Sequence, residues 1–339
     1  MTQLIYSEAE LARDHAFASA HEVGGYRLHG GFDAAGEYVS PRLAVRGPAV
    51  AAWQARLRED GWELIHADAK LLTTPPYPTF GQQKLLLRHG FQQTLWNSLT
   101  ITGIIEGRGR MLMEFRAPDF QQIVLEDTAG TATGHLNKGL LRFHGMDEGG
   151  DPDSGIGGHD VMWFAARDLL LGKDAFPLPE PPDRIGRPES TGRRIAEIPP
   201  EHEFTIELLM NVLMIEVRAE HTFHRNIRLM RDPELFTANR AGAETAAELV
   251  ARIQQDEKIH VEYLRTVISE WRAFTFRGAD GERIPGKRLI DPAWDAMVQW
   301  HAEENPRLQR EQMYPGYQRR ILELENGAGI LAEFNALDG

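Results

Sequence analysis

The chain has 339 residues, 42% of them hydrophobic, which suffices for one large domain or two modest ones. A formal net charge of −13 disfavours a general nucleic-acid-binding role. The absence of cysteine excludes disulfides, iron–sulfur clusters, thiolate zinc sites and cysteine nucleophiles, so any transition metal must be bound by His, Asp and Glu.

The N-terminal region alternates between helical and irregular patterns. Residues 7–24 predict a helix with Ser7 as its N-cap. Residues 24–48 predict an irregular segment with a short hairpin, and residues 48–60 a second helix. The start of the chain lacks a signal-peptide pattern, and no stretch reaches the roughly 18 apolar residues of a membrane span. We therefore expect a cytoplasmic protein with no membrane partner.

A long helical pattern follows over residues 82–115, and one carboxylate interrupts its apolar face. Glu106 lies among mostly apolar neighbours, and Gly103 and Gly107 would let another helix approach closely. Pro118 ends the pattern. Because a buried carboxylate needs a compensating charge, Glu106 is a candidate metal ligand.

The next predicted helix covers residues 119–146, and its apolar stripe has a candidate ligand on each border. On a helical wheel Glu126 falls on one border and His135 on the opposite one. Both residues are candidate ligands, although their opposite positions make it difficult for both to bind one metal.

A Gly/Asp-rich loop over residues 145–158 precedes another short predicted helix. His159, with Asp160, follows this loop and is interpreted as a helix cap in preference to a ligand pair. His144, at the end of the preceding helix, is interpreted as a structural or exposed histidine.

Beyond a Pro-rich connection over residues 177–200, a helix over residues 206–230 carries two more carboxylates in its apolar seam. These are Glu216 and Glu220. His224 lies one turn after Glu220, at the edge of the seam. No arginine falls on this seam, so a metal ion is a more natural counter-charge than an ion pair.

The following helix repeats this anomaly. Stepping by three and four from Ala246 to Trp271 gives an apolar seam that is interrupted by Glu257 and His260. A Glu-x-x-His pair places both side chains on one face, one turn apart. Breaker residues between 231 and 242 predict a bend that would bring Glu220 near Glu257 in an antiparallel helix pair.

At this point the sequence resembles the ferritin-like di-iron carboxylate superfamily. That pattern places a glutamate on the first helix, Glu-x-x-His on the second, a glutamate on the third and Glu-x-x-His on the fourth. Glu106 matches the opening glutamate, and Glu257 with His260 matches the last pair. For the third helix Glu220 is the preferred match and Glu216 the alternative.

The second helix departs from the superfamily pattern. No histidine stands three residues after Glu126, and no glutamate stands three residues before His135. Either Glu126 or His135 would therefore be the second-helix ligand, with His224 replacing the missing imidazole from the third helix.

The resemblance implies a mainly α fold, a ferritin-like antiparallel four-helix bundle with additional helices and irregular N- and C-terminal segments. The predicted parts are a helical and irregular extension over residues 1–80 that packs on the bundle, a bundle over residues 81–272 that includes the Pro-rich connection 177–200, and a second extension over residues 273–339. It implies two iron ions, with a manganese–iron pair as a variant, that use dioxygen on a small organic substrate. Hydroxylation, desaturation and N-oxygenation remain open, a separate electron donor is expected, and a homodimer is one assembly to consider.

Three alternatives remain open at this stage. The bundle could store or bind metal without oxidising a substrate, or it could be a purely structural helical protein with buried ion pairs. A mononuclear or hydrolytic centre could also use the second helix pair alone, with ligands from Glu216, Glu220, His224, Glu257 and His260.

Overall fold

The computed structural model describes residues 3–183, 185–188, 192–278 and 280–337. These residues are mainly helical, as predicted, and their strands form three two-stranded antiparallel sheets. The helices are α1 (Glu8–Leu11), α2 (Leu43–Glu59), α3 (Phe80–Arg88), α4 (Gln92–Gly109), α5 (Leu140–Gly149), α6 (His159–Leu171), α7 (Pro200–Arg231), α8 (Arg240–Ala273), α9 (Gly286–Gln299), α10 (Asn305–Leu322) and α11 (Gly327–Ala336). The strands are β1 (His21–Val23), β2 (Tyr26–Leu28), β3 (Gly31–Phe32), β4 (Tyr38–Val39), β5 (Thr275–Arg277) and β6 (Arg283–Pro285).

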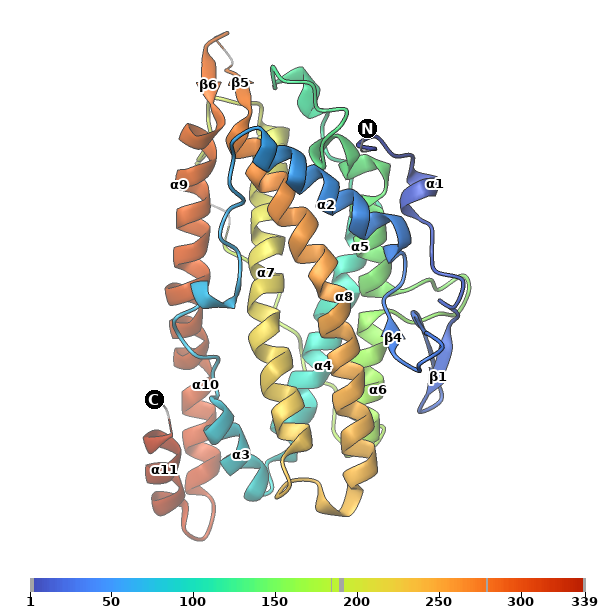
Figure 1. The fold of residues 1–339 in the computed structure, drawn as a ribbon. Helices are drawn as coiled ribbons and strands as arrows, with labels where there is room; N and C mark the ends of the chain where they lie inside the picture. The colour runs from blue at the N-terminus through green and yellow to red at the C-terminus, as the bar shows by residue number, and fades with distance from the viewer. Residues whose placement is uncertain (1–2, 184, 189–191, 279, 338–339) are drawn as a thin grey trace.

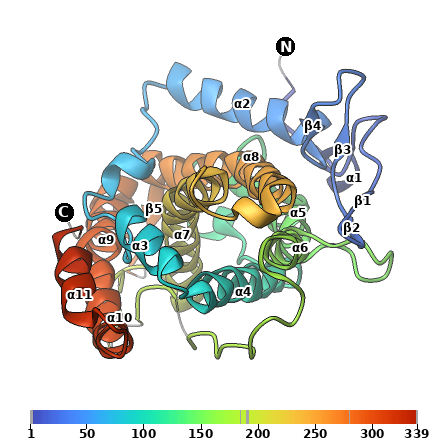
Figure 2. The ribbon, with the colours of Figure 1, turned by 90° about the horizontal axis from the view of Figure 1, so that it is seen from below.

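A bundle of long helices forms the body of the molecule (Figure 1). α7 packs along α8, α8 along α6, and α6 along α4. α5 also packs on α4, so α5 and α6 together take the place of the second bundle helix. Viewed along its axis, the bundle surrounds one interior (Figure 2). The break between α5 and α6, over residues 150–158, lies beside the candidate site.

The apolar seam of α8 explains how this helix is held. Every position predicted for the seam between Ala246 and Trp271 is buried, including Glu257 and His260. Burial of each large aliphatic side chain contributes about 1.5–3 kcal/mol, so the seam holds the helix in the interior despite its two polar members. On α7 the prediction is only partly correct, because Glu216 is buried whereas Glu220 is exposed.

The first predicted helix pair differs from the structure. The pattern over residues 82–115 is two helices, α3 and α4, separated near Gly90, whose φ of +86° suits glycine. The predicted helix over residues 119–146 is correct only from Leu140, where α5 begins; before it the chain has two short 3-10 helices, Phe120–Gln122 and Thr133–Lys138, within otherwise irregular structure. Local turn-forming hydrogen bonds and close backbone contacts determine the conformation of this segment. The Asp127 carboxylate accepts a hydrogen bond from the Ala129 N–H, and a Cβ at Gly134 would lie 2.1 Å from a backbone oxygen.

The N-terminal region packs against the bundle as a layer of short elements. The predicted capping box of Ser7 and Glu10 is present, but the helix it starts ends at Leu11. The hairpin expected within residues 24–48 is the β3–β4 pair, and a second pair, β1–β2, precedes it. α2 lies across α8 (Figure 1).

The C-terminal region continues from α8 through the β5–β6 hairpin into α9. A single π-helical turn, Trp300–Glu304, joins α9 to α10, and α9 packs on both α7 and α8. In the described ranges, no helix combines the length and the apolar character that crossing a bilayer requires.

Candidate metal centre

Carboxylates and imidazoles gather in the bundle interior at the level of the break between α5 and α6. They come from all the bundle helices, so the folding of the bundle positions them rather than one local motif. The members are Glu106 from α4, His144 and Glu148 from α5, His159 from α6, Glu216 from α7, and Glu257 and His260 from α8.

One subsite is formed by His144, Glu148, Glu216 and His260. One potential ligand atom from each lies within 4.8 Å of the others, and all four residues are buried. The His144 Nε2 atom lies 3.4 Å from Glu148 Oε1 and 3.2 Å from Glu216 Oε1. Two imidazoles and two carboxylates converging at this spacing are the donor types that iron, manganese and zinc use in proteins.

The second subsite is formed by Glu106, Glu148, His159 and Glu257, again within 4.8 Å of one another. The His159 Nδ1 atom lies 3.0 Å from Glu257 Oε1 and 3.5 Å from Glu148 Oε1. Glu106 is half-buried and the other three are buried. This subsite is richer in carboxylates than the first, since it has one imidazole and three glutamates.

Two glutamates connect the subsites. Glu148 Oε1 lies 3.3–3.5 Å from a nitrogen of all three imidazoles. Glu257 Oε1 lies 3.0 Å from His159 Nδ1, and Glu257 Oε2 lies 2.6 Å from His260 Nδ1. Both Oε1 atoms and His159 Nδ1 are buried, and although they lie close to one another they form no hydrogen bond of acceptable geometry among the described residues. Buried polar atoms need partners, and a pair of cations between these groups would provide them.

The pKa values of the cluster residues also indicate that the site needs positive charge. Burial and the Glu148 charge raise the pKa of Glu106 well above its ordinary value. Burial and Glu257 raise the pKa of Glu216 to about 7. Burial lowers the pKa of the His159 and His260 imidazoles, but Glu257 and the other carboxylates outweigh it and raise both pKa values well above the ordinary value. Without metal, protons therefore neutralise sites that metal ions would otherwise occupy.

Each imidazole uses its other ring nitrogen on an outer partner. Such partners fix the ring orientation around a metal and, when lost, typically cost about ten- to a hundredfold in metal affinity. The outer partners are the Tyr263 hydroxyl for His144 (2.8 Å), Asp256 for His159 (3.3 Å) and Asp147 for His260 (3.0 Å).

The N-terminal region holds the two outer carboxylates. Arg42 and Arg46 from the start of α2 pair with Asp147, the latter at 2.6 Å. His29 and the Tyr38 hydroxyl contact Asp256 Oδ2 at 3.1 and 2.9 Å.

His29, His159 and Asp256 also lie close enough together to hold a metal. The Tyr38 hydroxyl already donates to the shared Asp256 oxygen, so we assign this group as outer support of His159.

Glycines permit the close approach that brings the ligands together. At the end of α4, a Cβ on Gly109 would lie 2.7 Å from Cγ of Glu148. Gly103 and Gly107 let α6 approach α4 closely, as the sequence predicts. A Cβ on Gly103 would lie 2.6 Å from Phe164 Cε1, and a Cβ on Gly107 would lie 3.4 Å from Asp160 Cβ.

Replacing Gly109 with alanine should therefore displace Glu148. We expect Gly109→Ala to fold but to lose metal, because the added methyl group meets the carboxylate that both subsites share. Gly47→Ala in α2 is the matched control, since a Cβ there meets no atom within 4 Å. Metal content per chain after identical purification is the measurement, and equal content in both variants would contradict the role of this contact.

The structure brings together part of the predicted ligand set. Glu106, Glu257 and His260 are in the cluster, and Glu216, the alternative for the third helix, occupies the place expected for Glu220. Glu220 is exposed and lies outside the cluster. A helical wheel treats the whole seam of α7 as equivalent and does not show which part the neighbouring helices cover.

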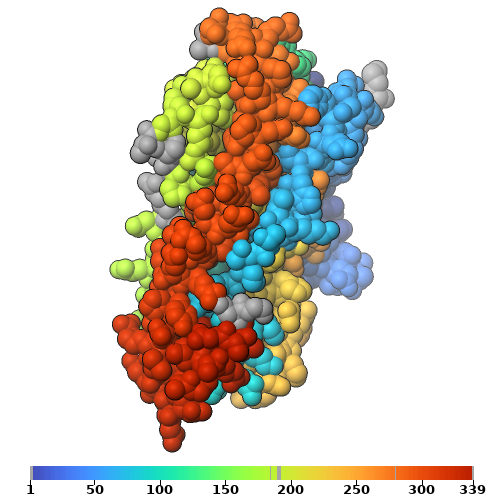
Figure 3. Space-filling model, turned by 90° about the vertical axis from the view of Figure 1, so that its left-hand side faces the viewer, coloured from blue at the N-terminus to red at the C-terminus, as the bar shows by residue number. Residues whose placement is uncertain are grey.

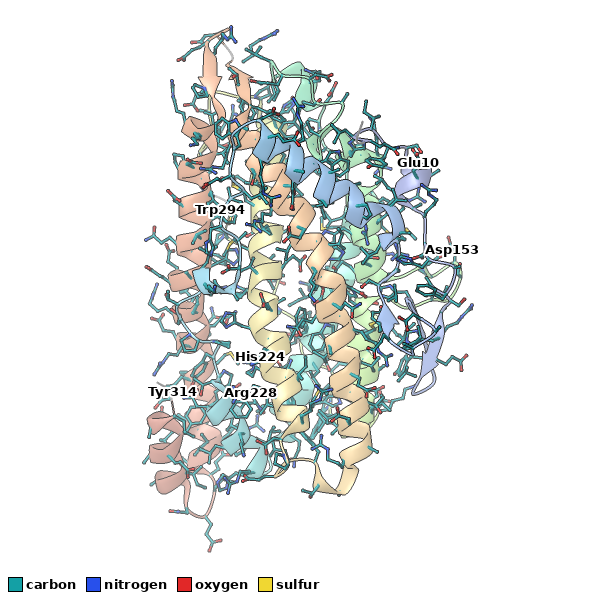
Figure 4. All side chains as sticks on the ribbon, viewed as in Figure 1. Glu10, Asp153, His224, Arg228, Trp294 and Tyr314 are labelled. Atoms are coloured by element: carbon teal, nitrogen blue, oxygen red, sulfur yellow. The ribbon has the colours of Figure 1, made fainter. Side chains whose placement is uncertain are left out.

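The remaining predicted ligands lie elsewhere. Glu126 is exposed and accepts a hydrogen bond from the Thr275 N–H at 2.8 Å. His135 is buried, but its Nε2 atom accepts from the Tyr6 N–H at 2.9 Å. His224 is exposed on α7, one turn before Arg228 (Figure 4).

Sequence reasoning missed His144, Glu148 and His159. His144 and Glu148 stand four residues apart, a spacing that places both on one helical face. His159 follows the glycine-rich loop that interrupts the bundle helix, so it required knowledge of how that loop folds. None of the family models, curated proteins and solved structures compared with this chain matches it.

Proposed function

We propose that the protein is a non-haem di-iron oxidoreductase that uses dioxygen on a small organic substrate. The arrangement of four glutamates and three histidines, with Glu148 and Glu257 contacting imidazoles of both subsites, supports this proposal. Four carboxylates balance the charge of two Fe(II) ions, so the buried centre would be close to neutral when reduced. A ferritin-like di-iron carboxylate relationship is part of the proposal, and it rests on this donor set within a helical bundle.

Each residue of the cluster would hold one or both of the ions. His144, His260 and Glu216 would hold one ion, His159 and Glu106 the other, and Glu148 and Glu257 both. A reduced iron pair bound here would supply electrons to dioxygen, and a separate donor would restore them. The Tyr263 hydroxyl and the outer carboxylates would keep the imidazoles in fixed orientations.

Glu106 indicates the side from which the centre would be reached. It is half-buried, whereas the other six members of the cluster are buried. Ile104 and Ile105, beside it on α4, are also only partly buried. An apolar substrate approaching along α4 would meet these isoleucines before the carboxylate, which fits a small and largely apolar molecule.

Oxygen consumption with product analysis tests this function. The iron-loaded protein, supplied with a reductant and a panel of small apolar and aromatic compounds, should consume dioxygen beyond the amount needed to oxidise its iron. At least one compound should be recovered hydroxylated, desaturated or N-oxygenated. Oxygen uptake in fixed proportion to added iron, with no organic product, would favour metal storage and contradict substrate oxidation.

A further inference from the structure

A second group of buried polar side chains lies on the other side of α7 from the metal centre. Arg218 follows Glu216 by two residues, a rotation of about 200° around the helix. His301 of the π turn is fully buried, and Asn305 at the start of α10 is 7% exposed. We call Arg218, His301, Asn305 and Arg187 the Arg218 cluster.

Asn211 contacts two members of this cluster, Arg187 and His301. Its Oδ1 atom accepts a hydrogen bond from the Arg187 backbone N–H at 2.9 Å and lies 3.1 Å from His301 Nε2. Asn211 precedes Arg218 by seven residues, so both lie on the same face of α7. Gly186 allows the contact, because a Cβ there would lie 2.0 Å from Asn211 Nδ2. Figure 3 shows the yellow-green connection that contains residue 187 beside the orange and red helices α9 and α10.

Several polar atoms of the Arg218 cluster have no hydrogen-bond partner among the described residues. They are Arg218 Nη1, Arg187 Nη1, His301 Nδ1 and Asn305 Nδ2, and all are buried. Arg218 and Arg187 lie close enough to His301 for their charges to act on it, and Asn305 follows His301 by about one helical turn. Unsatisfied buried polar atoms are rare in folded proteins, so this group suggests a missing ligand.

The charge of Arg218 also lacks a partner. Among the described residues, no carboxylate forms an ion pair with its guanidinium. Burial and the charges of Arg218 and Arg187 lower the pKa of His301 to about 2, so this imidazole is neutral. Glu207 and Glu304 both act on Arg187, and Glu207 is already paired with Arg194 at 2.9 Å. A water molecule could satisfy an N–H group here, but it would not neutralise a buried guanidinium.

The hydrogen bonds at Asn211 define what the ligand must offer. Because Asn211 Oδ1 accepts from a backbone N–H, it is the oxygen, and His301 Nε2 must carry the hydrogen that it donates. The neutral imidazole then presents a bare lone pair at Nδ1. A matching ligand accepts from Arg218 and Asn305 and donates one hydrogen to His301.

We propose that the Arg218 cluster binds a small oxyanion that carries a hydroxyl hydrogen, with the phosphate group as its chemical class. Its charged oxygens pair with the Arg218 guanidinium and the Asn305 amide, and its hydroxyl donates to His301 Nδ1. Arg218 and Arg187 are only partly buried, so the anion enters from their side. The π turn that carries His301 is a feature often found at functional sites.

Calorimetric titration of the metal-loaded protein with inorganic phosphate, at constant ionic strength, tests this site. We expect one saturable site per chain and an affinity at least about tenfold lower in Arg218→Gln. Arg228→Gln, an exposed arginine further along α7, should bind phosphate like the unmodified protein. Sulfate lacks the hydroxyl hydrogen and should bind at least about tenfold more weakly. Absent saturation, unchanged affinity in Arg218→Gln, or equal binding of sulfate would each overturn the proposal.

Thermal unfolding without phosphate gives an independent check on folding. Arg218→Gln removes a buried, unpaired charge, so it should unfold at the same temperature as the unmodified protein or higher. Phosphate should raise the unfolding temperature of the unmodified protein and leave that of the variant unchanged. A variant that unfolds at a clearly lower temperature would show that the guanidinium is satisfied within the protein, and the proposal would fail.

Discussion

Glu148→Ala is expected to remove both metal ions, lowering the metal content from about two per chain to nearly none. Its Oε1 atom lies 3.3–3.5 Å from nitrogens of all three imidazoles, so the substitution removes a ligand from both subsites at once. The imidazoles would keep their outer partners, but each subsite would have too few carboxylates to balance a divalent cation. Metal analysis after purification measures the effect.

Two matched variants make this result specific. Glu220→Ala and Glu126→Ala remove carboxylates that are exposed and lie outside the cluster. Both should retain the full metal content. Glu216→Ala should lose mainly the ion bound by His144 and His260, because Glu216 belongs to that subsite alone. If Glu148→Ala kept both ions, the assignment of a shared carboxylate would be wrong.

The Glu216 carboxyl is expected to make the metal-free protein less stable as the pH rises from about 5 to about 8, which is the second large effect. The pKa of Glu216 rises on folding from 4.5 to about 7, so the folded state holds a proton that the unfolded state releases. That contribution is complete below about pH 4.5, is lost by about pH 7, and is on the order of 3 kcal/mol. His159 and His260 act in the same direction, since their pKa values lie well above 6.5 in the folded state.

Carboxylates whose pKa falls on folding do not cancel this trend. Asp147 and Glu148 contribute stability above the pKa of the unfolded chain, and that contribution is lost only as the pH falls through the lower folded value. Between pH 5 and 8 their contribution is almost constant. Buried histidines whose pKa falls on folding, such as His301, act in the opposite direction between about pH 5 and 7. The Glu216 contribution is therefore measured as the difference between the unmodified protein and Glu216→Gln.

Denaturant unfolding at several pH values, with and without metal, measures this dependence. Metal ions replace the protons, so the loaded protein should keep or gain stability over the same range. Compared with the unmodified metal-free protein, Glu216→Gln should lose about 3 kcal/mol less stability between pH 5 and 8, because an amide does not titrate. The same pH dependence in both proteins would contradict the proposed electrostatics.

The long helices were predictable because their apolar periodicity is strong. The spacing of the α8 seam alone indicates that Glu257 and His260 are buried polar residues, and burial of the whole seam confirms that placement. On α7 the seam contains both Glu216 and Glu220, and periodicity does not distinguish them. Which of the two is covered depends on neighbouring helices, and that information is not local.

The first half of the bundle was poorly predicted for a different reason. Residues 119–139 carry helix-compatible spacing, yet turn chemistry and the carboxylate of Glu270 determine their path. Glu270 accepts the N–H groups of Ala132 and Thr133 at 2.8 Å, a contact across 137 residues or more. Contacts at such distances along the chain cannot be inferred from local patterns.

The outer support of the histidines was also beyond sequence reasoning. His29 reaches Asp256 across 227 residues, and Arg46 reaches Asp147 across 101. The N-terminal region was expected only to pack on the bundle. In the structure it supplies hydrogen bonds that orient two carboxylates behind candidate ligands.

Two metal ions are expected to share this interior, and X-ray absorption with metal analysis of the unmodified protein tests this most directly. Protein purified without added chelator should carry about two irons per chain, each with a second metal about 3.5–4 Å away. Protein that binds no iron when it is supplied, or binds a single ion with no metal neighbour, would contradict the shared centre.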